Sequence, residues 1–443
     1  MPIDPKDLDL LEEAVRRLRD GFAPLPVVAR SYDGARAREA LLAAAERMHD
    51  NFPYHHPLYV GQMLKPPHPV AKLAYAMAME LNPNNHALDG GRASSLMEKE
   101  AVAEIARMVG WEEHLGHLCG GGTFANFEAL WVARELAPGK AIAASSQAHY
   151  THSRLSSVLG VPFVPIPADE SGRMDLDALQ RELERGQIGT VVATLGTTAA
   201  GRLDPLPEIL QQARAAGVRV HVDAAYGGYF TLASNLESET RAAFDAMRDV
   251  DSIVIDPHKH GLQPYGCGCV LFKDPAVGRF YRHDSPYTYF SSGDLHLGEI
   301  TLECSRAGAS AVALWTTMRM LPLVHGGEFA RGLEAGREAA LALYAALRDD
   351  DRVAPLFPPE LDIVVWVVRA RSASEASARA REVFATAARH DLHLALASFP
   401  RAMAAHAISD WDGDDVLCLR ACVMKPEHRE WMPEIVKRLR ASI

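Results

Sequence analysis

The sequence lacks several features that would point to a membrane or a nucleic acid. No apolar run reaches the roughly 18 residues that a membrane span needs. No block of basic residues occurs, and the formal net charge of -11 argues against binding to nucleic acid or to an anionic membrane surface. Residues 1–22 alternate acidic, basic and apolar side chains instead of forming the apolar core of a signal peptide. We therefore expect a cytoplasmic protein whose partners are small molecules or a second copy of itself.

Cysteine is also sparse, with six residues among 443, mostly inside apolar runs. This distribution predicts reduced thiols rather than a disulfide framework. The stretch HLGHLC resembles metal-ligand spacing, but it lacks a second ligand pair and fits the face of a strand better, so no metal is expected. Cys267 and Cys269 likewise fit alternate positions on a strand. Nucleotide binding is disfavoured because there is no P-loop and no GxGxxG after a strand.

The chain is long enough for about two domains, and its middle alternates strand-like and helix-like stretches. Strands are expected at 190–198, 218–226, 252–259 and 268–272. A helix is expected at 204–217, with Asp204 as its N-cap and prolines in its first turn. This alternation predicts an α/β architecture: a mostly parallel central sheet, helices on both of its faces, and a ligand site beyond the strand ends.

The flanking regions have different compositions. Residues 52–91 are rich in Pro, His and Asn and look too irregular for regular structure, so this segment is expected to wrap over a site or a partner subunit. After about residue 327 the chain becomes Ala- and Arg-rich with strand-like interruptions, which predicts a smaller C-terminal α+β domain. The expected division is an N-terminal helical or wrapping segment at 1–85, a large domain at 86–326 and a small domain at 327–443.

Four local features carry chemistry. Three glycines and Thr123 lead into an amphipathic helix, a place that suits a phosphate but is also typical of a plain tight turn. Asp223 ends a buried strand, where an unpaired carboxylate is costly, and the small residue Ala225 follows it. Lys259 follows another buried strand, where burial lowers the pKa of an ammonium and makes it a candidate amine nucleophile. His149 and His152 lie among small hydroxyl residues and, taken alone, are typical of satisfied polar core groups.

Together these features suit pyridoxal 5'-phosphate, which needs a lysine for its Schiff base, an acid for its pyridinium nitrogen, a flat slot and a phosphate site. The sequence HVDAAY followed by DPHK resembles the group II pyridoxal-phosphate-dependent decarboxylases. This family includes the aromatic-amino-acid, tyrosine, glutamate and aspartate decarboxylases. The resemblance extends from about His56 to the C-terminus and implies the aspartate aminotransferase fold, also called fold type I.

The resemblance implies roles for individual residues. Lys259 would form the Schiff base, Asp223 would pair with the pyridinium nitrogen, and His149 and Ala225 would pack on opposite faces of the ring. The remaining residues that it places at the cofactor are Gly122 and Thr123 at the phosphate, His258 beside the lysine, and Asn126 and Thr194 along the slot. Three further residues would contact the substrate: Arg420 at its α-carboxylate, and Tyr59 and Gln62 in the pocket.

In this family a tyrosine on a loop after the lysine protonates Cα once carbon dioxide has left. Tyr287 and Tyr289 both suit this role, and the sequence does not decide between them. The resemblance also implies a homodimer whose subunits share the active site, with ECSRAG at residues 303–308 near the subunit boundary.

Three alternatives stay open. The first is an acidic substrate, aspartate or glutamate. The segment around Tyr59 is aromatic and poor in arginine, which favours an aromatic, tyrosine-like substrate instead. Another fold type I lyase or an aminotransferase is a second possibility, although the pair His258-Lys259 favours a decarboxylase or lyase. A catalytically silent scaffold is the third, and the presence of Lys259, Asp223 and His149 together argues against it.

Overall fold

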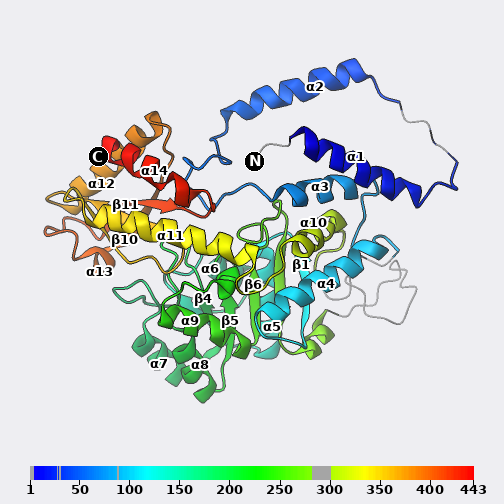
Figure 1. The fold of residues 1–443 in the computed structure, drawn as a ribbon. Helices are drawn as coiled ribbons and strands as arrows, with labels where there is room; N and C mark the ends of the chain where they lie inside the picture. The colour runs from blue at the N-terminus through cyan, green and yellow to red at the C-terminus, as the bar shows by residue number, and fades with distance from the viewer. Residues whose placement is uncertain (1–3, 27, 29–30, 87–88, 282–300) are drawn as a thin grey trace.

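The computed structural model describes residues 4–26, 28, 31–86, 89–281 and 301–443. Figure 1 shows a large α/β body, a smaller C-terminal layer beside it and N-terminal helices that extend beyond both.

The larger sheet has seven strands in the order β1-β7-β6-β5-β4-β2-β3. The pairs from β6 through β5, β4 and β2 to β3 are all parallel, whereas β7 runs antiparallel to both of its neighbours. The predicted mostly parallel sheet is therefore confirmed. Its strands are β1 (Leu115–Cys119), β2 (Ala141–Ser145), β3 (Phe163–Ile166), β4 (Ile188–Thr194), β5 (Arg219–Asp223), β6 (Ser252–Ile255) and β7 (Gly268–Phe272).

Alternation along the strands explains why helices cover both faces of this sheet. Val191 and Ile253 pack in the core that includes helices α4 and α8, whereas their neighbours Val192 and Val254 pack against α5 and α6 on the opposite face. The helices of this region are α4 (Arg92–Met108), α5 (Gly122–Leu136), α6 (Thr151–Leu159), α7 (Leu176–Glu184), α8 (Leu206–Ala215), α9 (Ser238–Asp245) and α10 (Gly308–Met320).

The C-terminal region forms a second, four-stranded antiparallel sheet in the order β10-β11-β9-β8. Trp366 lies fully buried at its centre and packs with residues of the flanking helices. All strands of this sheet follow residue 327 and all strands of the larger sheet precede it. The elements here are α11 (Glu328–Arg348), β8 (Val353–Pro355), β9 (Ile363–Val368), α12 (Ala373–Arg389), β10 (Ala395–Pro400), α13 (Arg401–Ala404), β11 (Asp415–Cys422) and α14 (His428–Ser442).

The N-terminal region is helical, with α1 (Pro5–Asp20), α2 (Gly34–Arg47) and α3 (Pro69–Ala78). Helix α1 packs against α3, whereas neither α1 nor α2 has a buried residue. In Figure 1, α2 lies apart from the body of the molecule. Among the described helices, none combines the length and the apolar character needed to cross a bilayer.

Two predictions about local structure are wrong. The segment 52–91 contains the regular helix α3, because Pro69 occupies a first-turn position, where proline favours a helix instead of breaking it. Asp204 does not cap α8: its carboxylate accepts hydrogen bonds from the backbone N–H groups of Met174 and Thr194, each at 2.8 Å. It therefore joins two loops at the edge of the sheet.

Candidate active site

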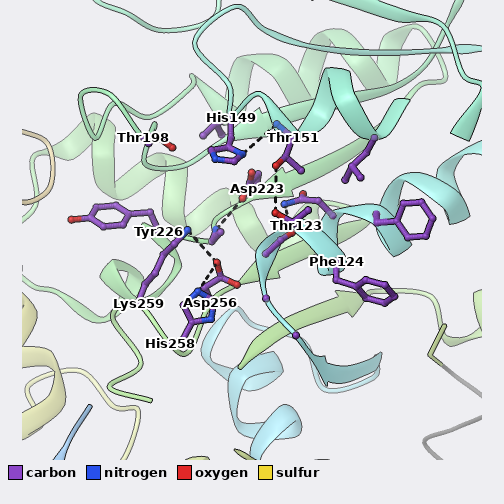
Figure 2. A pocket seen from close by; sticks show the side chains of 18 of the residues that line it. Thr123, Phe124, His149, Thr151, Thr198, Asp223, Tyr226, Asp256, His258 and Lys259 are labelled. Carbon is purple, nitrogen blue, oxygen red and sulfur yellow. Dashed lines mark hydrogen bonds and ion pairs between the residues drawn. The ribbon is translucent and has the colours of Figure 1, made fainter. Parts of the chain in front are cut away.

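A cavity of about 720 Å³ lies at the carboxyl ends of the central strands (Figure 2). Its walls come from the turn between β1 and α5 and from the segments that follow β4, β5 and β6. The position agrees with the rule that open α/β sheets bind ligands beyond their strand ends. The sequence-predicted residues that line it are Gly122, Thr123, Asn126, His149, Thr194, Asp223, Ala225, His258 and Lys259.

The glycine turn forms one end of the cavity and leaves no room for larger side chains. Gly121 has a φ of +147°, a conformation that L side chains rarely adopt. A Cβ at Gly122 would lie 2.6 Å from Oδ2 of Asp256. Asn126 fixes the turn from within α5, because its Nδ2 donates to the Gly122 carbonyl at 2.8 Å and its Oδ1 accepts from His221 Nε2 at 2.9 Å. The exposed Thr123 hydroxyl and the free amides of the helix start are available to an anion.

Lys259 has a charged partner that sequence reasoning missed. Its Nζ lies 3.1 Å from Oδ2 of Asp256, a buried carboxylate at the end of β6. The same Oδ2 lies 3.5 Å from His258 Nε2, and Asp256 Oδ1 is buried without a hydrogen-bond partner. The sequence led us to expect that burial disfavours the ammonium form of Lys259. That expectation needs correction, because Asp256 can compensate the ammonium charge. The signal was present in DPHK itself, three residues before the lysine.

Asp223 is held by a second partner that was not assigned a role, His152. The His152 ring is fully buried, and its Nε2 lies 2.9 Å from Asp223 Oδ2. The Ala225 backbone N–H donates to Asp223 Oδ1 at 3.1 Å. Burial alone would raise the pKa of Asp223, but the hydrogen bond and charge of His152, together with the Lys259 ammonium, hold it below its ordinary value. Asp223 is thus kept as a carboxylate facing the cavity.

The two predicted histidines lie on different sides of the cavity. His149 is near Asp223 in Figure 2, and burial lowers its pKa. His258 donates from Nδ1 to the Cys267 carbonyl at 2.8 Å, and burial lowers its pKa as well. Both rings are therefore favoured in the neutral form. Thr194 Oγ1 is buried without a hydrogen-bond partner and is free to contact a ligand.

The predicted substrate residues are not among those that line the cavity. Tyr59 is buried, with its ring packed edge-on against Tyr54 at 4.9 Å, and Gln62 is exposed. Arg420 comes nearest, because its Nε donates at 3.1 Å to the carbonyl of Ala199, next to a cavity residue. Its Nη2 is buried without a partner and can still bind an anion. Tyr287 and Tyr289 lie outside the described residues, so their assignment stays a prediction.

The described residues on either side of the segment that carries these two tyrosines meet at one buried carboxylate, Glu128 of α5. Tyr281 donates its hydroxyl to Glu128 Oε2 at 2.9 Å, and the Leu302 backbone N–H donates to Oε1 at 3.1 Å. His117 Nε2 lies 2.8 Å from Oε2. Burial alone would lower the pKa of His117, but the Glu128 carboxylate raises it above its ordinary value.

These features fit pyridoxal phosphate and define an enzyme that uses it on fold type I. The glycine turn would hold the phosphate, Asp223 would meet the pyridinium nitrogen, and Lys259 would supply the amine. The unpartnered Thr194 hydroxyl gives the slot a further polar contact. A cavity of this volume lies within the range that cofactor sites usually have.

Comparisons with known proteins agree. Residues 130–368 match the pyridoxal-dependent decarboxylase conserved domain. An L-tyrosine decarboxylase of Enterococcus faecium is 30% identical over 427 residues, covering 72% of this chain and 70% of that protein. A probable L-tyrosine/L-aspartate decarboxylase of Methanosphaera stadtmanae is 29% identical over 345 residues, covering 76% and 85%. The crystal structure of Oryza sativa TDC with PLP and tryptamine aligns with a TM-score of 0.77 at 18% identity, covers 100% and 99% of the two chains, and shows the shared fold.

The chain therefore belongs to the pyridoxal-dependent decarboxylase family. It is an amino acid carboxy-lyase that uses pyridoxal phosphate, and the predictions of family, fold class, cofactor and reaction class are confirmed.

Proposed function

We propose that this enzyme removes carbon dioxide from an aromatic L-amino acid, with tyrosine as the favoured substrate. The observation that carries the proposal is the apolar part of the cavity wall, which includes Phe124, Phe127, Leu155 and Val158. Lys259 is the one Lys or Arg among the described residues lining the cavity, so a substrate's side-chain carboxylate would have no second cation there. The names of the tyrosine and tyrosine/aspartate decarboxylases that it resembles support the choice.

The residues in and near the cavity have separate roles toward the cofactor and the substrate. When bound, pyridoxal phosphate supplies the electron sink that accepts the electron pair of the breaking bond between Cα and the carboxylate. Asp223 holds a proton at the pyridine nitrogen, and the amides of Gly122 and Thr123 bind the phosphate. Lys259 would supply the amine that holds the cofactor, and Asp256 Oδ2, 3.1 Å from its Nζ, can compensate an ammonium charge there. Arg420 directs the substrate through the unpartnered Nη2.

We also propose a homodimer with a shared active site. Helices α1 and α2 carry exposed apolar side chains, among them Leu8, Leu10, Leu41 and Leu42, with Leu41 being 71% exposed. Apolar residues gathered on helices with no buried side chain indicate a surface that another protein covers. A second copy of the chain is the partner that fits the family. Sedimentation equilibrium should give twice the mass of one chain, and charged substitutions at Leu41 and Leu42 should release monomers.

We place the enzyme in the cytoplasm, and its six free cysteines, five of them buried, support a reducing compartment.

The test of the substrate is a panel of the twenty amino acids incubated with cofactor-loaded enzyme, in which released carbon dioxide is measured and amine products are identified by mass. We expect kcat/KM for tyrosine to exceed that for aspartate by about 100-fold, because a carboxylate in an apolar pocket lacks a partner. Lys259→Ala serves as the inactive control. Preference for aspartate would contradict the substrate assignment, and a keto acid product would contradict decarboxylation.

A further inference from the structure

A second cavity, of about 450 Å³, lies on the other side of the lysine segment from the first. Lys259 lines the first cavity and the next residue, His260, lines the second. The two also share a polar wall. Tyr226, which lines the first cavity, donates its hydroxyl to Asp362 at 2.5 Å, and Asp362 Oδ2 lies 3.3 Å from His260 Nε2. No role in the reaction described above accounts for this cavity.

Two ammonium groups of the second cavity, Lys65 and Lys425, have no acidic partner in direct contact among the described residues. Lys425 is 3% exposed and its Nζ donates to the Tyr59 carbonyl at 2.7 Å, while Lys65 Nζ has a long contact of 3.4 Å with the Met424 carbonyl. Within the described part of the chain, neither ammonium forms an ion pair within 4.0 Å. Burial lowers the pKa of Lys65 to about 8, and burial together with Lys65 does the same to Lys425. Asp362 and Glu427 act on Lys65, and Glu427 on Lys425, only from beyond that distance, so neither ammonium has a counter-ion in direct contact.

His260 adds a second unsatisfied group to the same wall. Its ring is 1% exposed; Nε2 faces Asp362 Oδ2 at 3.3 Å without hydrogen-bond geometry, and Nδ1 has no hydrogen-bond partner among the described residues. Buried polar atoms without a partner are rare in folded proteins and mark places where a ligand or an ordered water completes the structure. Nδ1 can donate to a ligand in the cavity when it carries the ring proton.

The remaining walls restrict the anion. Leu262, Leu321, Phe329 and Leu333 give the cavity apolar surface that suits a hydrocarbon body. Glu328 and Glu427, both exposed, also line it and would repel a second negative charge. A monoanion with an apolar body fits these walls better than inorganic phosphate or a dicarboxylate.

We propose that this second cavity binds a small organic monocarboxylate, with the Lys65 and Lys425 ammonium groups as its charged partners and His260 as a further donor. The site lies behind the residue that holds the cofactor, so its occupant contacts the same segment of chain as the reaction centre without entering it.

The experiment is a calorimetric titration of the cofactor-loaded dimer or monomer, as purified, with benzoate. Lys65→Met should weaken binding by about 10-fold or more, because it removes one charge-assisted contact. Glu427→Gln should tighten binding, because it removes a like charge from the rim of the cavity. Two controls should leave the affinity unchanged within about twofold: Lys437→Met, at an exposed lysine on α14, and Arg420→Met, at the residue proposed to meet the substrate carboxylate.

A crystal soaked with 4-bromobenzoate locates the ligand by its anomalous signal, which should appear beside Lys65 and Lys425. Lys65→Met should melt no lower than the wild type in buffer without carboxylate and should lose the stabilisation that benzoate gives to the wild type. The proposal is overturned by any of three results: no binding at about 10 mM benzoate, affinity that neither Lys65→Met nor Glu427→Gln changes, or bromine in the first cavity alone. Inorganic phosphate binding as tightly as benzoate would overturn the assignment to a monocarboxylate.

Discussion

Replacing His152 with leucine tests how the cofactor's acid is held. The substitution removes the 2.9 Å contact between His152 Nε2 and Asp223 Oδ2 and fills the space with an apolar side chain of similar size. Asp223 then keeps the Ala225 N–H as a hydrogen-bond donor, and the balance of burial and charge moves its pKa upward from the lowered value. A smaller fraction of Asp223 would then be ionised opposite the pyridine nitrogen.

The size of the effect follows from the lost interaction. A hydrogen bond to a charged group contributes about 1.5–3 kcal/mol, and each ~1.4 kcal/mol changes an equilibrium constant tenfold. If this energy is lost from cofactor binding, the affinity of the protein for pyridoxal phosphate should fall by about 10- to 100-fold. The loss should grow as the pH decreases, because a raised pKa lets Asp223 take up a proton at a higher pH than in the wild type.

The assay is a titration of the cofactor-free protein with pyridoxal phosphate, followed by the visible absorbance of the bound form at several pH values. Ser156→Ala is a matched control, since its buried hydroxyl lies one turn later on α6, donates to the His152 carbonyl at 2.8 Å and does not line the cavity. If His152→Leu folds and binds the cofactor as tightly as the control does at every pH, the role assigned to the His152–Asp223 pair is refuted.

Three further predictions concern other groups. Lys259→Ala should abolish both carbon dioxide release and the visible absorbance of bound cofactor; a retained band with turnover would exclude this lysine as the attachment point. Arg420→Met should lower kcat/KM by about 100-fold while cofactor affinity, measured by titration, stays the same; a matching loss of cofactor affinity would contradict a role at the substrate. Glu128→Gln should lower the free energy of unfolding in urea by about 3 kcal/mol, because it breaks a buried ion pair with His117. Because the His117 pKa is raised in the folded state, the stabilisation from this pair is complete below pH ~6.5 and is lost as the pH rises through the higher folded value, a dependence that the variant should not show.

The sequence predicted the sheet and much of the cavity because those features are local. Buried strands show as β-branched runs, and the residues that follow a strand in a parallel sheet gather at one edge, which is why the sequence alone was enough to place Asp223 and Lys259 together. The predicted roles of these residues still await the experiments above.

Contacts between distant parts of the chain could not be read in the same way. His152 lies 71 residues before Asp223, and either residue alone is typical of an ordinary core group. Asp256 was missed for a different reason, because a carboxylate at a strand end has many possible partners until the direction of the Lys259 side chain is known. Asp204 shows the same limit: its position before a helix favours a cap, yet tertiary contacts direct its oxygens to Met174 and Thr194.

Glu128 has a consequence for how this enzyme can vary. Since Tyr281 and Leu302 meet the same carboxylate, one buried side chain joins the described residues on either side of 282–300. The larger sheet, the glycine turn and Lys259 all lie outside the stretch between those two residues. Grafting the stretch between Tyr281 and Leu302 from a related decarboxylase is therefore a practical way to change the reaction outcome, as long as Glu128 keeps both contacts.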